Sequence, residues 1–197
     1  MSVETIRYFS PEETKRFFSK IKRKRDRALF FLMYTYGLRC IEAAGIDLED
    51  LRLRDDRLYV HAAKNGKSGE VTLTREAKKV LDIYIKERAQ QNGYHDALFL
   101  SRKSKTADGR LSTTQIYRLF RYYAHKAKIP KDKQHPHVLR HSIAVHMADS
   151  GVPQEHVKEH LRHRKISSTD DYFEITNKKR HEFQAKALAS EFVVKRI

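Results

Sequence analysis

The chain has 197 residues, of which 40% are hydrophobic, so it can bury the core of one good-sized domain and is too apolar for a disordered protein. It carries 41 Lys and Arg against 25 Asp and Glu, and the net charge of +16 predicts a polyanionic partner such as nucleic acid. The single cysteine excludes an internal disulfide and is typical of a reducing cytoplasm, and the polar, acidic N-terminus lacks the apolar core of a signal peptide.

Helices are expected over most of the chain. Ser10 can cap the first one, with Pro11 in its first turn and Glu13 completing a capping box. The second is expected to begin at Asp26 and to end at Gly37, and its apolar run is far too short to span a bilayer. Further helices are predicted over residues 40–45, 75–89, 116–127, 136–149, 153–161, 167–173 and 178–194.

Between these helices the periodicity changes to that of strands. Alternating segments at 51–54, 58–61 and 71–74 are separated by turn residues, which predicts a small antiparallel sheet. A basic turn at 64–67 lies at one end of it, and the polar stretch 101–110 is expected to be a loop. The predicted fold class is therefore mainly α with a small antiparallel β-sheet (α+β), in a single domain over residues 1–197 without internal repeats.

Several polar side chains lie at the boundaries of these elements, where a phosphate-cleaving site could gather. Phosphodiester cleavage without a metal needs cations for the phosphate, a nucleophile and an acid for the leaving oxygen. Each candidate has an ordinary alternative, such as a helix-end cation, a soluble turn lysine or one packed tyrosine among ten. The candidates are Arg39 after the buried helix, Lys64 at the hairpin turn, His137 and Arg140 at a helix N-terminus, and His163 and Tyr172 near the end of the helical region.

The order of these residues resembles the tyrosine recombinase (phage-type integrase) family. Residues 36–44 (YGLRCIEAA) resemble its first-arginine motif, and residues 135–142 (HPHVLRHS) resemble its H-x-L-R-H box. Residues 161–172 (LRHRKISSTDDY) resemble its closing motif, in which a histidine stands nine residues before the tyrosine. Lys64 and Lys67 fit the K-x-x-K pattern of its hairpin. Four motifs in family order are far more specific than any one of them.

The resemblance implies an enzyme that cuts and rejoins double-stranded DNA, in site-specific recombination or integration, with no cofactor and no metal. Tyr172 would attack the scissile phosphate and form a 3′-phosphotyrosyl link. Arg39 and Arg140 would hold the non-bridging oxygens, and His137 and His163 would hydrogen-bond the same phosphate, with His137 also a candidate for proton transfer. Because the phosphotyrosyl ester conserves bond energy, rejoining would need no ATP.

The resemblance implies roles for three further residues. Lys64 would protonate the leaving 5′-oxygen, a role for which Lys67 competes, and Glu42 would support the arginine cluster. Arg162 stands where the family usually has glycine, so it is expected to change the backbone or to add a phosphate contact, and it puts the level of activity in question. Candidates for DNA-backbone contacts are Lys67, Arg102, Lys103, Lys105, Arg118, Arg121 and Arg162, with a solvated helix face as the alternative.

The resemblance divides the chain into a lead-in at 1–9, a catalytic core at 10–175 and a C-terminal helix at 176–197, which packs on its own domain or on a neighbouring protomer. Only nine residues precede Ser10, so either a minimal recombinase or an excised catalytic domain is expected. The resemblance also implies self-association on DNA as a synaptic tetramer, possible accessory DNA-binding factors, no membrane, and a cytoplasmic, prokaryotic or phage-encoded protein.

Other functions remain open from the sequence. A protein on the same fold could bind DNA without cleaving it, although binding alone needs no poised tyrosine. A type IB topoisomerase would share the chemistry and relax supercoils without sequence preference. The pattern H-x-x-E-H at His156 and His160 matches an inverted zinc-protease signature, but no third ligand is evident and five-residue patterns arise easily in a chain with 11 histidines.

Overall fold

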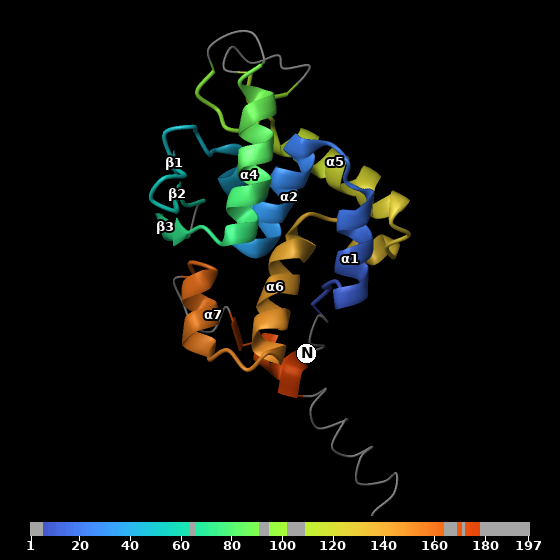
Figure 1. The fold of residues 1–197 in the computed structure, drawn as a ribbon. Coiled ribbons are helices and arrows are strands. Elements are labelled where there is room, and N and C mark those ends of the chain that lie inside the picture. The colour runs from blue at the N-terminus through green and yellow to red at the C-terminus, as the bar shows by residue number, and fades with distance from the viewer. Residues whose placement is uncertain are drawn as a thin grey trace, which may run out of the picture.

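The computed structural model of the protein describes residues 6–63, 66–90, 95–101, 109–163, 169–170 and 172–177. Helices make up most of this part of the chain, and a three-stranded antiparallel sheet lies at one side (Figure 1). The predicted fold class is confirmed. The helices are α1 (Pro11–Lys20), α2 (Lys24–Thr35), α3 (Cys40–Ala44), α4 (Arg75–Arg88), α5 (Thr113–Lys126), the 3-10 helix η1 (Lys131–Lys133), α6 (His137–Asp149) and α7 (Gln154–His160).

Local capping chemistry starts the helices α1 and α5. The backbone N–H of Glu13 donates to Ser10 Oγ at 3.2 Å, and Ser10 N–H donates to the Glu13 carboxylate at 2.8 Å. Ser112 and Gln115 form the same reciprocal pair at the start of α5. These boxes satisfy N–H groups that have no partner inside the helix.

Helix α2 begins at Lys24, two residues before the predicted start at Asp26. Asp26 does not cap the helix. Its fully buried carboxylate lies 2.6 Å from Nη2 of Arg25 and accepts a hydrogen bond from the hydroxyl of Tyr123 on α5 at 2.8 Å. The carboxylate of Asp26, which the sequence pattern assigns to the start of a helix, is therefore bound by Tyr123, a residue far along the chain.

The sheet has the strand order β1 (Leu51–Arg52), β2 (Arg57–Val60) and β3 (Gly69–Thr72). Its strands lie within one or two residues of the predicted segments, with Leu58 of β2 paired to Leu51 on one side and Val71 on the other. Strand β1 is shorter than predicted because the chain turns after Arg52, where Asp56 adopts a φ of 58°. Gly66, between β2 and β3, pairs with His163 in an antiparallel bridge, so this side of the sheet meets the segment that follows α7.

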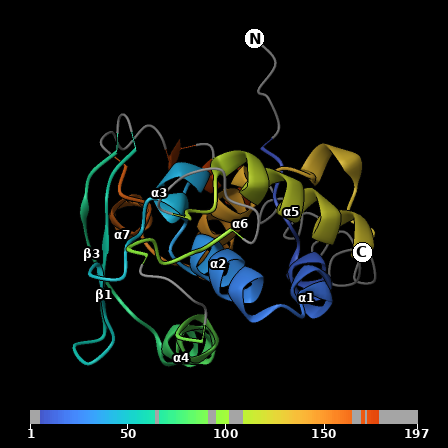
Figure 2. The same cartoon turned by 90° about the horizontal axis from the view of Figure 1, so that it is seen from above.

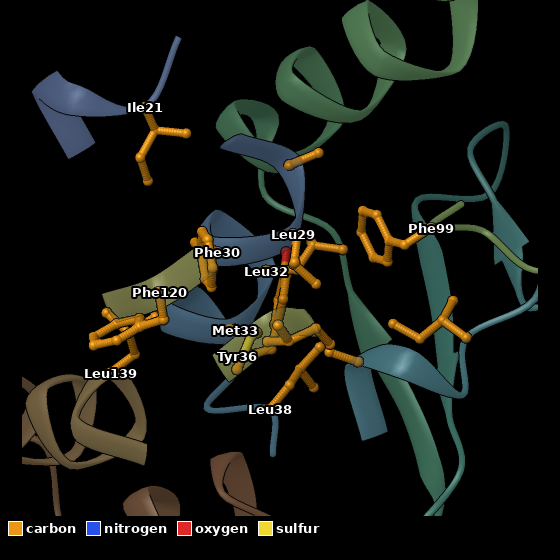
Figure 3. Close-up of a cluster of buried hydrophobic side chains, with 14 of the residues drawn as sticks. Ile21, Leu29, Phe30, Leu32, Met33, Tyr36, Leu38, Phe99, Phe120 and Leu139 are labelled. Atoms are coloured by element: carbon orange, nitrogen blue, oxygen red, sulfur yellow. The ribbon is translucent and has the colours of Figure 1, made fainter. Parts of the chain in front are cut away.

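The main hydrophobic core surrounds α2, which lies at the centre of the helices when the molecule is seen from above (Figure 2). Phe30 and Met33 are fully buried, and Phe120 of α5, Leu139 of α6 and Phe99 meet the same cluster (Figure 3). Burying each side chain of this size stabilises the fold by about 1.5–3 kcal/mol. Because α2 packs on both α4 and α6, it fixes the relative positions of the segments that follow it.

A second, smaller core joins α6 and α7. Val145 of α6 and Val157 of α7 pack there with Leu161 and with the ring of Tyr172. The described part of the predicted 167–173 helix is helical and continues to residue 177. The predicted 178–194 helix lies outside the described residues. Of the helices that are described, none has both the length and the hydropathy to cross a membrane.

Candidate active site

Arg39 reaches the site because the chain reverses sharply after α2. Gly37 has a φ of +58°, a left-handed conformation that glycine adopts at little cost, and Leu38 is buried behind it. Arg39 then opens α3, where its backbone N–H and its Nη1 donate to the two oxygens of Glu42 at 2.8 and 2.7 Å. Burial by itself would raise the pKa of Glu42, but these hydrogen bonds hold it below its usual range. Glu42 is therefore in direct contact with Arg39.

Arg140, in the first turn of α6, is almost completely buried. Its Nη1 donates to the carbonyl of Gly37 at 2.5 Å, and its Nη2 donates to the carbonyl of Leu161 at 2.6 Å. Burial lowers the pKa of Arg140 to about 10, with Arg39 acting in the same direction, so the guanidinium stays charged at neutral pH. Two carbonyls, one after α2 and one after α7, thus fix its orientation.

Arg162 has a left-handed backbone conformation, with a φ of 54°. Its side chain is turned inward and is 8% exposed. Nη2 donates to the carbonyl of Tyr36 at 3.1 Å and lies 3.6 Å from Oε2 of Glu42. Nε is buried and has no hydrogen-bond partner. Arg162 therefore adds a third guanidinium to the pair expected from the sequence.

His163 and the hairpin lie next to these arginines. Gly66 pairs with His163 in an antiparallel bridge, and the backbone N–H of Lys67 donates to the carbonyl of Arg162 at 3.3 Å. A Cβ built on Gly66 would lie 3.4 Å from Nη1 of Arg39, so the backbone at Gly66 lies close to that guanidinium. Burial, Arg140 and Arg39 lower the pKa of His163 to about 4, and its buried Nδ1 has no hydrogen-bond partner.

His137 occupies the first position of α6 and is exposed to solvent on one side. The protein packed around its other side, together with Arg140 and Arg39, lowers the pKa of His137 to about 4. His137 and His163 are therefore both neutral at pH 7. A neutral imidazole can donate one hydrogen bond to a phosphate oxygen without adding another positive charge to the cluster.

The hydroxyl of Tyr172 meets a residue to which the sequence assigned no role. Tyr172 is 4% exposed, and its Oη forms a hydrogen bond of 2.9 Å with Nδ1 of His141. The ring of His141 also packs perpendicular to that of His137, with 4.5 Å between centroids. One signal in the sequence could have identified it: His141 directly follows Arg140 and stands four residues after His137, on the same helix face.

The remaining candidates are not all gathered at this site. Lys67 is exposed at its edge, and Arg118 and Arg121 are exposed on α5. Lys64, Arg102, Lys103 and Lys105 lie outside the described residues.

The zinc pattern at His156 and His160 has another explanation in the structure. Nε2 of His160 forms a hydrogen bond with the carbonyl of Thr35 at 2.8 Å, and its ring stacks on Tyr36. His156 is exposed and lies 3.8 Å from Glu159. In the part of the chain that the structure describes, no group of three or more His, Cys, Asp or Glu side chains is arranged to hold a metal ion.

The charges of the site favour an anion. Arg39, Arg140 and Arg162 contribute three positive charges around the carboxylate of Glu42. When buried guanidiniums outnumber the carboxylates around them, the excess positive charge destabilises the fold unless another anion neutralises it. A phosphate matches the fork geometry of Arg and can accept hydrogen bonds from neutral histidines.

Comparison with known proteins identifies a group of similar chains. Residues 7–179 match the profile of the Phage integrase family. The tyrosine recombinase XerA of Pyrococcus horikoshii is 29% identical over 183 residues, which cover 93% of this chain and 62% of that protein. The type 1 fimbriae regulatory protein FimE of Escherichia coli is 32% identical over 150 residues, covering 75% of this chain and 73% of FimE. The chain spans about three fifths of the length of the XerA relatives it matches.

Solved structures show the same fold. The crystal structure of XerA recombinase aligns with a TM-score of 0.79 and 24% identity, over 98% of this chain and 66% of that one. XerH site-specific recombinase, in a post-cleavage complex with a palindromic difH substrate, aligns with a TM-score of 0.78 and 22% identity, over 93% of this chain and 53% of that one.

Proposed function

This chain belongs to the phage integrase family of tyrosine recombinases, and from that premise we propose that it cuts and rejoins double-stranded DNA through a 3′-phosphotyrosyl intermediate in site-specific recombination. The single observation that supports this most strongly is the meeting of two separate motifs on α6. Arg140 is fixed there by hydrogen bonds to the carbonyls of Gly37 and Leu161. The next residue, His141, forms a hydrogen bond with the hydroxyl of Tyr172.

In this proposal the scissile phosphate binds over the arginine cluster. Arg39 and Arg140 hold its non-bridging oxygens and stabilise the charge of the pentavalent state. His137 and His163, both neutral, hydrogen-bond the same group. Glu42 orients Arg39 and does not react.

The cleavage step transfers one bond and needs no external energy source. The Oη of Tyr172 bonds to phosphorus while the bond from phosphorus to the 5′-oxygen breaks, and Lys64 gives the leaving oxygen a proton. Rejoining is the reverse, with the 5′-hydroxyl attacking the phosphotyrosine. Because Tyr172 lies next to a histidine of its own chain, attack within the same protomer is favoured.

The rest of the DNA would contact exposed basic residues. Arg118 and Arg121 project from α5 and Lys67 from the hairpin, and the net charge of +16 supports contacts with several phosphates. We further propose that the protein associates with itself on DNA as a synaptic tetramer, with possible accessory DNA-binding factors, in the cytoplasm of a prokaryote or as a phage-encoded protein. Residues 10–175 would form the catalytic core, and 176–197 a C-terminal helix.

The test uses suicide DNA substrates, nicked so that cleavage releases a short fragment, taken from the DNA that flanks the gene. Reactions contain EDTA and no ATP, and compare the wild type with Tyr172→Phe and with Tyr59→Phe, a matched change on strand β2. We expect a protein–DNA adduct that resists denaturant in the wild type and in Tyr59→Phe and is absent in Tyr172→Phe.

Other results would point elsewhere. An adduct that persists in Tyr172→Phe would show that another residue is the nucleophile. Tight binding to every substrate without an adduct would favour a DNA-binding protein without catalysis. Relaxation of supercoiled plasmid without sequence preference would favour a type IB topoisomerase activity.

A further inference from the structure

The hydroxyl of Tyr172 has a ring nitrogen within hydrogen-bond distance. Nδ1 of His141 lies 2.9 Å from Oη, within the range for a proton transfer along a hydrogen bond. His141 is held in place twice, by its position on α6 directly after the buried Arg140 and by the perpendicular contact of its ring with His137. Its ring also contacts that of Tyr172, with 5.7 Å between centroids.

His141 is neutral in the resting protein. Burial, followed by the neighbouring titratable groups His137, His135 and Arg140, lowers the pKa of His141 to about 3. A neutral imidazole keeps a lone pair on one of its nitrogens, and a phenol can donate its proton to that lone pair. A phenol with an ordinary pKa of about 10 is hardly ionised at neutral pH, so attack on phosphorus is faster when a base removes the proton.

We propose that His141 is the proton acceptor for Tyr172: as Oη bonds to phosphorus, the Oη–H bond breaks and its proton moves to Nδ1 of His141. The step rests on the proposed function, in which Tyr172 is the nucleophile. The 5′-oxygen leaves with the electron pair of its bond to phosphorus and takes a proton from Lys64. In rejoining, the imidazolium of His141 returns its proton to the departing phenolate, so the protein ends in its starting state.

The charges around His141 explain how it can act as a base only when DNA is bound. After burial, the titratable groups that lower its pKa are His137, His135, Arg140 and His163, and of these Arg140 carries a positive charge at neutral pH. A phosphate on the arginine cluster places negative charge among these groups, and the pentavalent state carries more negative charge than the bound substrate. Both changes raise the proton affinity of His141 at the moment when the phenol loses its proton.

The resting hydrogen bond can be tested without DNA. In protein labelled with nitrogen-15 in histidine, we expect Nδ1 of His141 at neutral pH to have the resonance of an unprotonated, hydrogen-bonded nitrogen, and Tyr172→Phe should shift it. If Nδ1 is protonated at neutral pH, His141 cannot accept the proton of Tyr172, and the proposal is overturned. This measurement does not depend on how any variant of His141 folds.

The chemical step is tested with suicide substrates whose scissile 5′-oxygen is replaced by sulfur, because a thiolate leaves without an acid and attack by Tyr172 is then observed alone. We compare His141→Gln with the wild type and with His156→Gln, an exposed control on α7. At neutral pH we expect His141→Gln to form adduct more slowly by about 10²–10⁴-fold. Its rate should rise about tenfold per pH unit as the phenol ionises unaided, while the wild-type rate changes little. DNA affinity should be unchanged in both variants.

The outcomes separate this inference from the function on which it rests. Adduct in the wild type and equally fast adduct in His141→Gln would overturn the role of His141 and leave Tyr172 as the nucleophile. A slower His141→Gln with the same pH profile as the wild type would reduce His141 to a packing residue and also overturn the proposal. No adduct in the wild type on any substrate would overturn both.

Discussion

Arg162 and Glu42 form an ion pair inside the arginine cluster, with 3.6 Å between Nη2 and Oε2. Both side chains are less than a tenth exposed, and the other oxygen of Glu42 accepts a hydrogen bond from Nη1 of Arg39. One carboxylate therefore joins the end of α7 to the start of α3. It holds two guanidiniums that would repel each other without it.

Removing this carboxylate should destabilise the whole protein. Glu42→Gln keeps the shape of the side chain but leaves Arg39 and Arg162 without a negative partner, and breaking a buried pair in this way costs about 3–5 kcal/mol. The measurement is urea-induced unfolding at neutral pH. Glu49→Gln, an exposed acid after the same helix, should change stability by less than about 0.5 kcal/mol. Equal effects in the two variants would contradict the pairing.

The left-handed backbone at Arg162 makes its two smallest replacements unequal. Arg162→Ala and Arg162→Gly both lose the contacts with Glu42 and Tyr36, but only alanine keeps a Cβ at a φ of 54°. We therefore expect Arg162→Gly to be more stable than Arg162→Ala by about 1 kcal/mol, measured by thermal or urea unfolding. If alanine is as stable as glycine at this position, the backbone there is not left-handed in solution.

Gly37 combines a left-handed backbone with a close neighbour. A Cβ at this position would lie 2.5 Å from Cδ2 of Leu161, and its φ is +58°. Gly37→Ala should lower stability by about 1–3 kcal/mol and slow cleavage, because the carbonyls of Gly37 and Leu161 orient Arg140. Gly151→Ala is the matched control, since Gly151 has a φ of +83° and open space around it. Gly151→Ala should show the backbone cost alone and leave cleavage unchanged.

Acid should weaken the fold through the histidines of the site. The pKa values of His137 and His163 are lowered to about 4 and that of His141 to about 3, whereas unfolded histidines titrate near 6.5. Between about pH 6.5 and pH 4 the unfolded chain binds protons that the folded chain does not, so the free energy of unfolding falls as the pH falls. Urea unfolding across this range should show a shallower pH dependence in His141→Gln than in the control His156→Gln. An identical slope in the two variants would show that His141 is not shielded from protons.

Arg118 and Arg121 on the exposed face of α5 should contribute to DNA affinity but not to the chemical step. Changing both to glutamine should weaken binding on all sequences and reduce the slope of log affinity against log salt by about 2, roughly 1 for each lost phosphate contact. Fluorescence anisotropy over a range of salt concentrations measures this slope. Lys79→Gln, on the exposed face of α4, is the control for lost charge alone. An unchanged slope in the double variant would place α5 away from the DNA.

Local rules predicted the start of α1, where Ser10 and Glu13 form the capping box that their spacing indicates. Ser112 and Gln115 form a second capping box, which starts α5 at Thr113, three residues before the predicted start at residue 116. Asp26 has the same chemistry as a capping residue, but a tyrosine on α5 takes its carboxylate instead. The difference lies in a partner far along the chain, which no local pattern reports.

At the site, too, the sequence motifs identified some residues, while contacts between distant segments decided the roles of others. The motifs pointed to Arg39 and Arg140, and both are found at one cluster. The sequence assigned no partner to Tyr172 and offered Arg162 as a contact with DNA. Packing of the segment after α7 against α6 brings Tyr172 to His141, and the left-handed turn at Arg162 directs its side chain inward.

Local sequence patterns predicted most of the helices and strands and the fold class, because helix caps, turns and apolar periodicity depend on neighbours within about four residues. The residues of the site came from the resemblance of the sequence motifs to a known family. The tertiary structure decided which side chains meet and which of them stay charged. Glu42 lies between Arg39 and Arg162, and His141 is held neutral beside Tyr172, only because the core around α2 and the smaller core between α6 and α7 bring these segments together. Burial and the charges of distant segments set those protonation states, and both arise only when the chain is folded.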